Sequence, residues 1–228
     1  MQLSTSTIFI IQQPCFREGL TFKYHANKPE GYTFICEASD LSHIDDESYD
    51  FIMSSHVIEH IANPLKTISE WKRVVRIGGV ILFVCPHKDG TYDHKRPITP
   101  LAHLIEDYIK GVDENDLTHQ SEVLKLHDLS RDTNSYDQVL AVSTKNFEYR
   151  WLHHHVFVSE SWITILDYLN LEVACIGAWL PFNIIAVGKK VDETPENLER
   201  LHASNMRLLA VNARWRLTSP FQLDKSCL

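Results

Sequence analysis

The stretch from Tyr49 to Pro86 constrains the fold of this chain more than any other, because it reads as a strand, a helix and a second strand. The apolar run Phe51–Met53 suits a short strand that is buried on both faces. Apolar residues then recur at three- and four-residue steps, which marks one face of a helix: Leu65, Ile68, Trp71, Val74 and Val75. The pair Gly78–Gly79 is expected to end this helix, and Val80–Val84 reads as the second buried strand. A unit of this kind is a crossover between two parallel strands.

Three motifs in this unit are more specific than its apolar pattern: Tyr49-Asp50 before the first strand, Val57–His60 after it, and Trp71–Gly79 before the second strand. Together they resemble the fourth and fifth strands of class I S-adenosylmethionine-dependent methyltransferases of the type 11 kind. The resemblance covers Tyr32–Pro86 and, more weakly, Val158–Val187. It implies an α/β, Rossmann-like fold with a largely parallel sheet, helices on both faces and a terminal antiparallel strand pair. It also implies S-adenosylmethionine as the cofactor.

The resemblance places cofactor contacts on two turns. Glu37 and Ala38 match the family's turn that binds the adenine ring, and a solvated turn is an equally weighted interpretation. Ser54, Ser55 and His56 follow the first strand of the unit, where they would touch the amino-acid end of the cofactor. The carboxyl end of a parallel strand is where such sheets bind ligands. A helix cap is the competing interpretation of these three residues, but their position favours binding.

Residues 1–30 depart from the family pattern. The family has a glycine-rich loop there, whose glycines let the backbone approach the cofactor closely. Only two glycines precede the pair Gly78–Gly79, and no Gly-x-Gly occurs anywhere in the chain. Three explanations stay open: the N-terminal half of the cofactor site is lost, the chain is N-terminally truncated, or the loop has diverged. Leu20–Tyr24 and Tyr32–Cys36 are predicted to be the second and third strands of the sheet.

A long insertion, residues 87–155, follows the second strand of the unit and is predicted to be a lid that selects the acceptor. Asp93–Tyr108 resembles a motif of a bacterial subgroup of the family. Leu101–Ile109 has the pattern of an amphipathic helix, and Ser121–Leu129 is a second helix candidate. The pattern of Val139–Arg150 is ambiguous.

After the insertion the chain is expected to return to the sheet. The apolar spacing of Trp162–Leu169 predicts a helix, and Leu171–Ile176 and Phe182–Val187 are predicted to be an antiparallel strand pair. Residues 1–190 are therefore predicted to form the methyltransferase-like domain, and residues 191–228 a C-terminal helical extension.

The chain has thirteen histidines, and several of them lie in the insertion. A neutral imidazole can take the proton from a hydroxyl or amine as the methyl group arrives. The candidates for this catalytic role are His87, His94 and His154. The predicted acceptor-binding residues are Arg96, His103, His153 and His155. Arg96 would suit a phosphate or carboxylate. Histidines that are simply hydrogen-bonded within a polar insertion are a close alternative.

The run His153–His155 could also suggest a metal. Successive residues of an extended chain point to opposite faces, so at most two of these rings could meet at one ion. No further ligand at helical metal spacing sits beside them in the sequence. No metal site is therefore predicted, and a histidine-cluster metal hydrolase is the weakest functional alternative.

Charge and hydropathy limit the partners. The formal net charge of −8 argues against a broad nucleic-acid-binding face, and no apolar stretch approaches the ~20 residues of a membrane span. A cytoplasmic protein without a nucleic-acid or membrane partner is expected. The sequence as a whole predicts S-adenosylmethionine-dependent methyl transfer to a small-molecule or glycan-type acceptor. The main alternative is a non-catalytic binding or scaffold protein that has lost the glycine loop.

Overall fold

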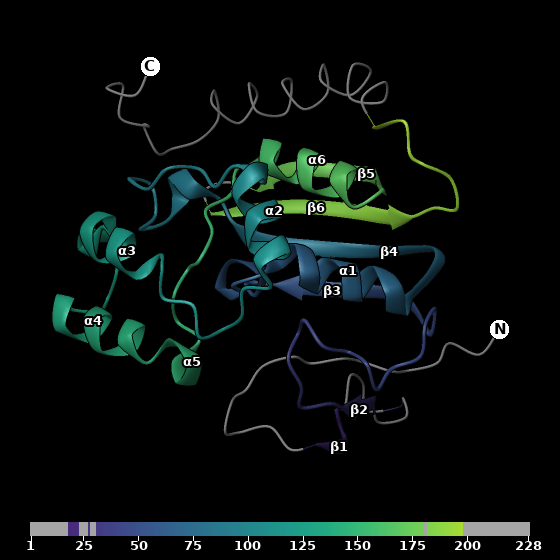
Figure 1. Cartoon of the computed structure of the whole chain (residues 1–228), viewed down its shortest axis with the longest axis horizontal. Helices are drawn as coiled ribbons and strands as arrows, with labels where there is room; N and C mark the ends of the chain where they lie inside the picture. Colours follow the sequence, from purple (N-terminus) through teal and green to yellow (C-terminus); the bar gives the residue numbers. More distant parts are fainter. Residues whose placement is uncertain (1–17, 23–26, 28–30, 180–181, 198–228) are drawn as a thin grey trace.

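The computed structural model describes residues 18–22, 27, 31–179 and 182–197, and a four-stranded sheet lies at its centre (Figure 1). The strands follow the order β3-β4-β6-β5 and are β3 (Tyr49–Ser55), β4 (Val75–Pro86), β5 (Leu171–Trp179) and β6 (Asn183–Lys190). β3 and β4 are parallel, whereas β6 runs antiparallel to both β4 and β5. The α/β fold, the parallel crossover and the terminal antiparallel pair are confirmed. Within these four strands the sheet is mixed, with one parallel pairing.

The crossover helix α1 (Pro64–Val74) is confirmed and contains the predicted apolar face except for Val75, which begins β4. The Asn63 side chain accepts a hydrogen bond from the Lys66 amide at 3.1 Å, and Pro64 occupies the first turn. The prediction that Gly78–Gly79 ends the helix is wrong, because both glycines lie inside β4. Gly78 has a φ of +79°, and a Cβ on Gly79 would lie 2.6 Å from the carbonyl oxygen of Asp50. The two glycines thus allow the shift in register between β3 and β4, at a point where the two backbones approach closely.

The insertion is mostly helical. Its helices are α2 (Leu101–Lys110), α3 (Gln120–Leu126), α4 (Tyr136–Thr144) and α5 (Asn146–Tyr149). Single turns of 3-10 helix occur at η1 (Ile58–His60), η2 (Lys88–Gly90) and η3 (Leu129–Arg131). The helix α6 (Ser159–Tyr168) follows the insertion. The two predicted insertion helices and the helix after the insertion are confirmed, and the ambiguous stretch is helical.

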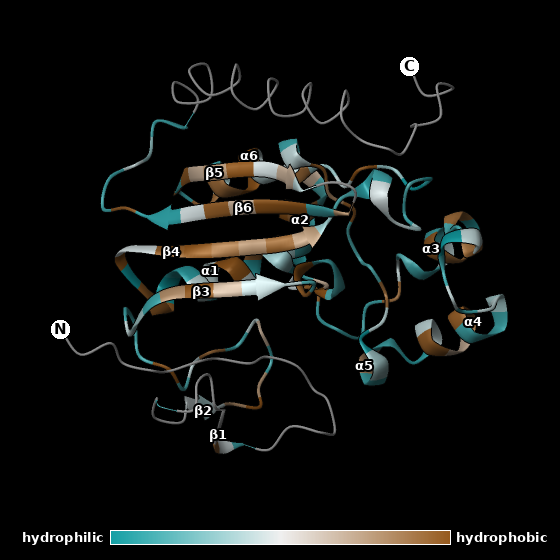
Figure 2. Ribbon diagram, turned by 180° about the vertical axis from the view of Figure 1, so that it is seen from behind, coloured by the Kyte–Doolittle hydropathy of each residue, from teal (hydrophilic) through white to brown (hydrophobic). Residues whose placement is uncertain are grey.

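One face of the sheet carries α1, α2 and α6, as the two opposite views show (Figures 1 and 2). Trp71 of α1, Phe83 of β4 and Trp162 of α6 form the centre of this layer, with ring centroids 5.9 and 4.4 Å apart. Such aromatic pairs add about 0.5–1.5 kcal/mol each beyond their burial. On the opposite face Phe51 and Met53 are 62% and 64% exposed. The prediction of helices on both faces therefore holds for one face within the described residues.

The N-terminal strands lie apart from the main sheet. β1 (Gly19–Phe22) and β2 (Gly31–Thr33) form their own antiparallel pair. The prediction that these segments extend the main sheet is wrong, and Phe34–Cys36 lies outside any strand. The connection between β1 and β2 is too short for them to be parallel neighbours in one sheet. A parallel crossover needs about a dozen residues, and only residues 23–30 separate these two strands.

Some predictions fall on parts of the chain that the structure does not describe. Most of the C-terminal extension, residues 198–228, lies outside the described residues, as does the turn at residues 180–181. The domain division at residue 190 stays a prediction. Among the described residues no helix has both the length and the apolar character needed to cross a bilayer.

Candidate functional site

The carboxyl ends of β3 and β4 lie side by side and bring several of the predicted site residues together. Ser54 and Ser55 pair with Phe83 and Val84 of β4, and the amide of His56 donates to the Val84 carbonyl at 2.8 Å. The amide of His87, just after β4, donates to the Phe182 carbonyl at 2.7 Å. His56 has a φ of +52°. A left-handed backbone is uncommon for a residue other than glycine and is enriched at functional sites. We call this region the carboxyl edge.

A buried carboxylate lies behind the carboxyl edge. Glu59 is 1% exposed, and its Oε1 lies 3.5 Å from Nδ1 of His56 and 3.9 Å from Nε2 of His60. Neither oxygen of Glu59 accepts a hydrogen bond of normal geometry from the described residues. Burial acts to raise the pKa of Glu59, but the neighbouring imidazoles of His56, His153 and His60 outweigh it and lower this pKa. Glu59 is therefore a carboxylate at neutral pH.

The pKa values of the two imidazoles beside Glu59 shift in opposite directions. The side chain of His56 is 51% exposed, and its interaction with Glu59 raises its pKa above the ordinary value. His60 lies deeper, and burial together with the charge of His153 lowers its pKa to about 4. His56 is thus the imidazole of this group that can exchange a proton with a bound molecule near neutral pH.

A chain of polar side chains continues from this group into the insertion. Nδ1 of His153 lies 2.5 Å from Oδ2 of Asp93, and the Tyr92 hydroxyl lies 2.8 Å from Nε2 of His153. Arg96 donates to Asp93 at 2.9 Å and to Glu122 at 2.8 Å, and it is 1% exposed. The Arg96 side chain is therefore already paired inside the protein. The geometry favours a structural role for it over the predicted contact with an anionic acceptor.

The turn predicted to hold adenine is anchored from two sides. The Trp71 indole donates to the Ala38 carbonyl at 3.1 Å, which ties the turn to α1. Nη2 of Arg150 lies 2.5 Å from Oε1 of Glu37, and Nη1 of the same guanidinium lies 3.0 Å from Glu114. Glu37 keeps 42% of its side chain exposed. A hollow of about 330 Å³ adjoins the turn and is lined by Ser39, Asp40, Ser42, Lys66, Ser69, Glu70 and Tyr108.

The remaining predicted residues lie elsewhere. His94 pairs with Asp128 at 2.7 Å in the insertion. His154 is 1% exposed and contacts Asn146 at 3.1 Å, and burial lowers its pKa to about 3. Of the three catalytic candidates, the structure places only His87 at the carboxyl edge. The first ring of the histidine run faces Asp93 and the second faces Asn146, but the second and third rings both lie beside the His119 ring, so the expected alternation does not hold along the whole run.

The third histidine of the run, His155, meets His103 in a separate cluster with Asp107 and His119. Burial lowers the pKa of His119, and it lowers that of His155 well below the ordinary value, so both imidazoles are neutral. These residues do not reach the carboxyl edge through any hydrogen bond that we observe in the described part of the chain. Their predicted role in acceptor binding stays a prediction.

Sequence reasoning gave no role in binding or catalysis to three residues of the site: Glu59, Tyr92 and Asp93. The spacing of His56 and Glu59 fits a helix cap, although histidine is a poor capping residue. The importance of Glu59 depends on its burial and on His153, which lies far along the chain. No local pattern carries that information.

The comparison with protein families agrees with the resemblance seen in the sequence. Residues 18–83 match the family model described as a methyltransferase domain. The match covers 66 of the 228 residues, and for this segment it agrees with the expected enzyme class. No curated protein matches the chain.

Several solved structures that are weakly similar to the chain are described as methyltransferases. An S-adenosylmethionine-dependent methyltransferase from Methanosarcina mazei has 14% identity and a TM-score of 0.41 over 72% of this chain and 69% of its own. The trans-methyltransferase CalH, solved with S-adenosylhomocysteine, has 10% identity and a TM-score of 0.39 over 71% of this chain and 36% of its own. The methyltransferase domain of the citrinin polyketide synthase has 11% identity and a TM-score of 0.37, over 71% and 33%.

The carboxyl edge fits the chemistry of S-adenosylmethionine. This cofactor combines a positively charged sulfonium and an amino-acid end with an adenine ring. The buried Glu59 carboxylate has oxygens without a hydrogen bond of normal geometry, which suits a cationic neighbour. The partly exposed Glu37 can accept a hydrogen bond from an amino group. Glu37, Ala38 and the turn Ser54–His56 are the residues that would hold the cofactor.

Proposed function

We propose that this chain transfers a methyl group from S-adenosylmethionine to a hydroxyl or amine of a small-molecule or glycan-type acceptor. The observation that carries the proposal is the pair of His56 and the buried Glu59 at the carboxyl edge. The cofactor supplies a methyl group that the sulfonium already activates, so the protein contributes mainly alignment and a proton acceptor.

The geometry favours His56 as the proton acceptor. Because Nδ1 of His56 faces the Glu59 carboxylate, this nitrogen carries the proton and Nε2 keeps a lone pair. With the cofactor and acceptor bound, Nε2 of His56 would take the proton that the acceptor oxygen or nitrogen gives up when the methyl group leaves sulfur for that atom. The resulting imidazolium is stabilised by Glu59, which stays ionised. His56, first predicted as a cofactor contact, thus also becomes the favoured base.

His87 suits a different role at the same edge. Its Nδ1 accepts a hydrogen bond from the Asp89 amide at 3.2 Å, so the proton of the neutral ring sits on Nε2. Burial lowers the pKa of His87, which keeps the ring neutral. His87 would therefore donate a hydrogen bond and orient the acceptor. His94 and His154 lack such a position.

The insertion is suited to select the acceptor because it packs directly on the loop that follows β3. The amide of His154 donates to the Glu59 carbonyl at 2.8 Å, and Glu114 accepts from the Ala62 amide at 3.2 Å. Segments far apart in the sequence thus fix the position of the catalytic turn. This arrangement supports the proposed lid.

The proposal is tested by measuring the release of S-adenosylhomocysteine from S-adenosylmethionine with a panel of acceptors. The panel contains primary amines, small hydroxyl compounds and oligosaccharides, each at equal concentration. Turnover with one acceptor class, above the rate without acceptor, is the expected result. Cofactor binding without turnover on any class would overturn methyl transfer to these acceptors and favour the non-catalytic alternative.

A further inference from the structure

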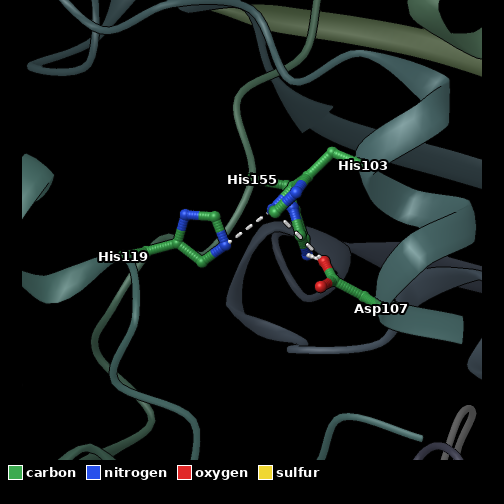
Figure 3. A group of neighbouring side chains, drawn as sticks. All are labelled: His103, Asp107, His119 and His155. Atoms are coloured by element: carbon green, nitrogen blue, oxygen red, sulfur yellow. Dashed lines mark hydrogen bonds and ion pairs between the residues drawn. The ribbon is translucent and has the colours of Figure 1, made fainter. Parts of the chain in front are cut away.

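Four metal-ligating side chains converge inside the insertion, away from the carboxyl edge (Figure 3). His103 and Asp107 lie one turn apart on α2, so both point from one face of that helix. His119 immediately precedes α3, and His155 belongs to the extended segment before α6. We call these four residues the histidine cluster. It draws on segments that are far apart in the sequence, so sequence spacing alone reveals only its first pair.

The distances in the histidine cluster match those between ligands of one tetrahedral ion. Zinc bonds to nitrogen and oxygen are about 2.0–2.2 Å long, which places neighbouring ligand atoms of a tetrahedron ~3.4 Å apart. Nε2 of His103 lies 3.1 Å from Nε2 of His119 and 3.4 Å from Oδ2 of Asp107. Nε2 of His155 lies 3.9 Å from the same carboxylate oxygen. All four ligand atoms lie within 4.8 Å of one another, so the side chains would close in on the ion as it binds.

The histidine cluster also contains a buried carboxylate oxygen that a cation would satisfy. Asp107 is 7% exposed, and its Oδ2 has no hydrogen-bond partner in the described part of the chain. A cluster held only by the hydrogen bond between His103 and His119 would leave this carboxylate oxygen buried and unsatisfied, which is unfavourable. A divalent ion would satisfy it. The imidazole of His155 now contacts the Ala62 carbonyl through Nε2, at 3.1 Å, and its proton would move to Nδ1 when the metal binds.

We propose that His103, Asp107, His119 and His155 bind one zinc ion that holds α2, the start of α3 and the segment before α6 together. Three imidazoles and one carboxylate suit zinc, whereas magnesium and calcium prefer oxygen ligands alone. Four protein ligands leave no open position, which is typical of a structural site. The His103 side chain is 34% exposed and provides an entry path from solvent. The site departs from the prediction that the chain has no metal, and it does not depend on the proposed methyl transfer.

The test is a calorimetric titration of the purified, chelator-treated full chain with Zn²⁺. Thermal unfolding with and without Zn²⁺ is measured beside it. One zinc ion per chain is expected. At about one hundred times Kd, Zn²⁺ should raise Tm by roughly 5–10 °C, because it binds only the folded state. Mg²⁺ at the same concentration should have no such effect. No saturable zinc binding, or equal binding of both ions, would overturn the proposal.

Variants assign the binding to the histidine cluster. His103→Ala and Asp107→Asn should each weaken zinc binding by more than about a hundredfold. Replacing a residue that only hydrogen-bonds to a metal ligand already lowers metal affinity about ten- to a hundredfold. His43→Ala is the matched control, because His43 is an exposed histidine outside the cluster, and it should bind zinc as the wild type does. The circular dichroism of each metal-free variant checks that it is folded. Unchanged zinc binding by His103→Ala would place the ion elsewhere, for example at Glu59, His60 and His153, and would contradict the proposal.

Discussion

Replacing His56 with alanine is expected to lower kcat for methyl transfer by about a hundredfold to ten-thousandfold, the usual contribution of a positioned general base. The variant removes the imidazole that faces the buried Glu59 carboxylate at 3.5 Å. His56 is half exposed, so its loss should leave the fold intact. The measurement is the steady-state rate of S-adenosylhomocysteine release with the acceptor class found active. A rate within about twofold of the wild type would exclude His56 as the base.

The pH dependence of the methyl-transfer rate in a second variant, Glu59→Gln, tests whether His56 acts as the base or has only a structural role. Glu59 raises the pKa of His56 above its ordinary value of about 6.5, so the rate should rise with pH through a midpoint above that value. Glu59→Gln removes this cause, and the midpoint should move to lower pH. Glu148→Gln, which changes an exposed carboxylate of α5, is the control and should leave the midpoint unchanged. A midpoint that stays in place in Glu59→Gln would contradict the pairing.

Replacing Arg96 with alanine is expected to lower the free energy of unfolding by about 3–5 kcal/mol, the typical effect of breaking a buried ion pair. Arg96 is 1% exposed and holds Asp93, Glu122 and the carbonyl oxygens of His153 and His154. Its removal leaves the Asp93 carboxylate buried without its guanidinium. The measurement is urea-induced unfolding followed by circular dichroism.

The matched control for Arg96 is Lys110→Ala on α2. Lys110 pairs with Glu106 at 2.7 Å, but both side chains are more than half exposed, so water replaces the lost contact. This variant should unfold close to the wild-type midpoint. Equal unfolding midpoints for Arg96→Ala and Lys110→Ala would contradict the prediction that the buried contacts of Arg96 stabilise the fold.

The central part of the fold could be predicted because its signals are local. The apolar spacing of α1 and the Asn63-Pro64 start define that helix, and the apolar run in β4 needs no partner to be recognised. The role of Gly78–Gly79 could not be predicted, because glycine both ends helices and allows irregular strands. Which of the two occurs depends on how closely β3 approaches.

The site was predictable only in part for a similar reason. The turn Ser54–His56 could be found from its position at the end of a strand, where parallel sheets bind ligands. The base and its partner could not, because the carboxylate of Glu59 acquires its properties from burial under the insertion. In the same way, His103 and Asp107 share a helical spacing, but His119 and His155 reach them only through the fold.

The most direct test of cofactor binding by the Glu37–Ala38 turn and the carboxyl edge is calorimetric titration of the full chain with S-adenosylhomocysteine. The account predicts saturable binding by the wild type and about tenfold weaker binding by Glu37→Ala, the effect of losing one hydrogen bond to a charged group. Glu37→Gln keeps an oxygen acceptor and should bind more tightly than the alanine variant. The absence of binding by the wild type up to millimolar ligand would contradict the account, as would equal affinities of all three proteins.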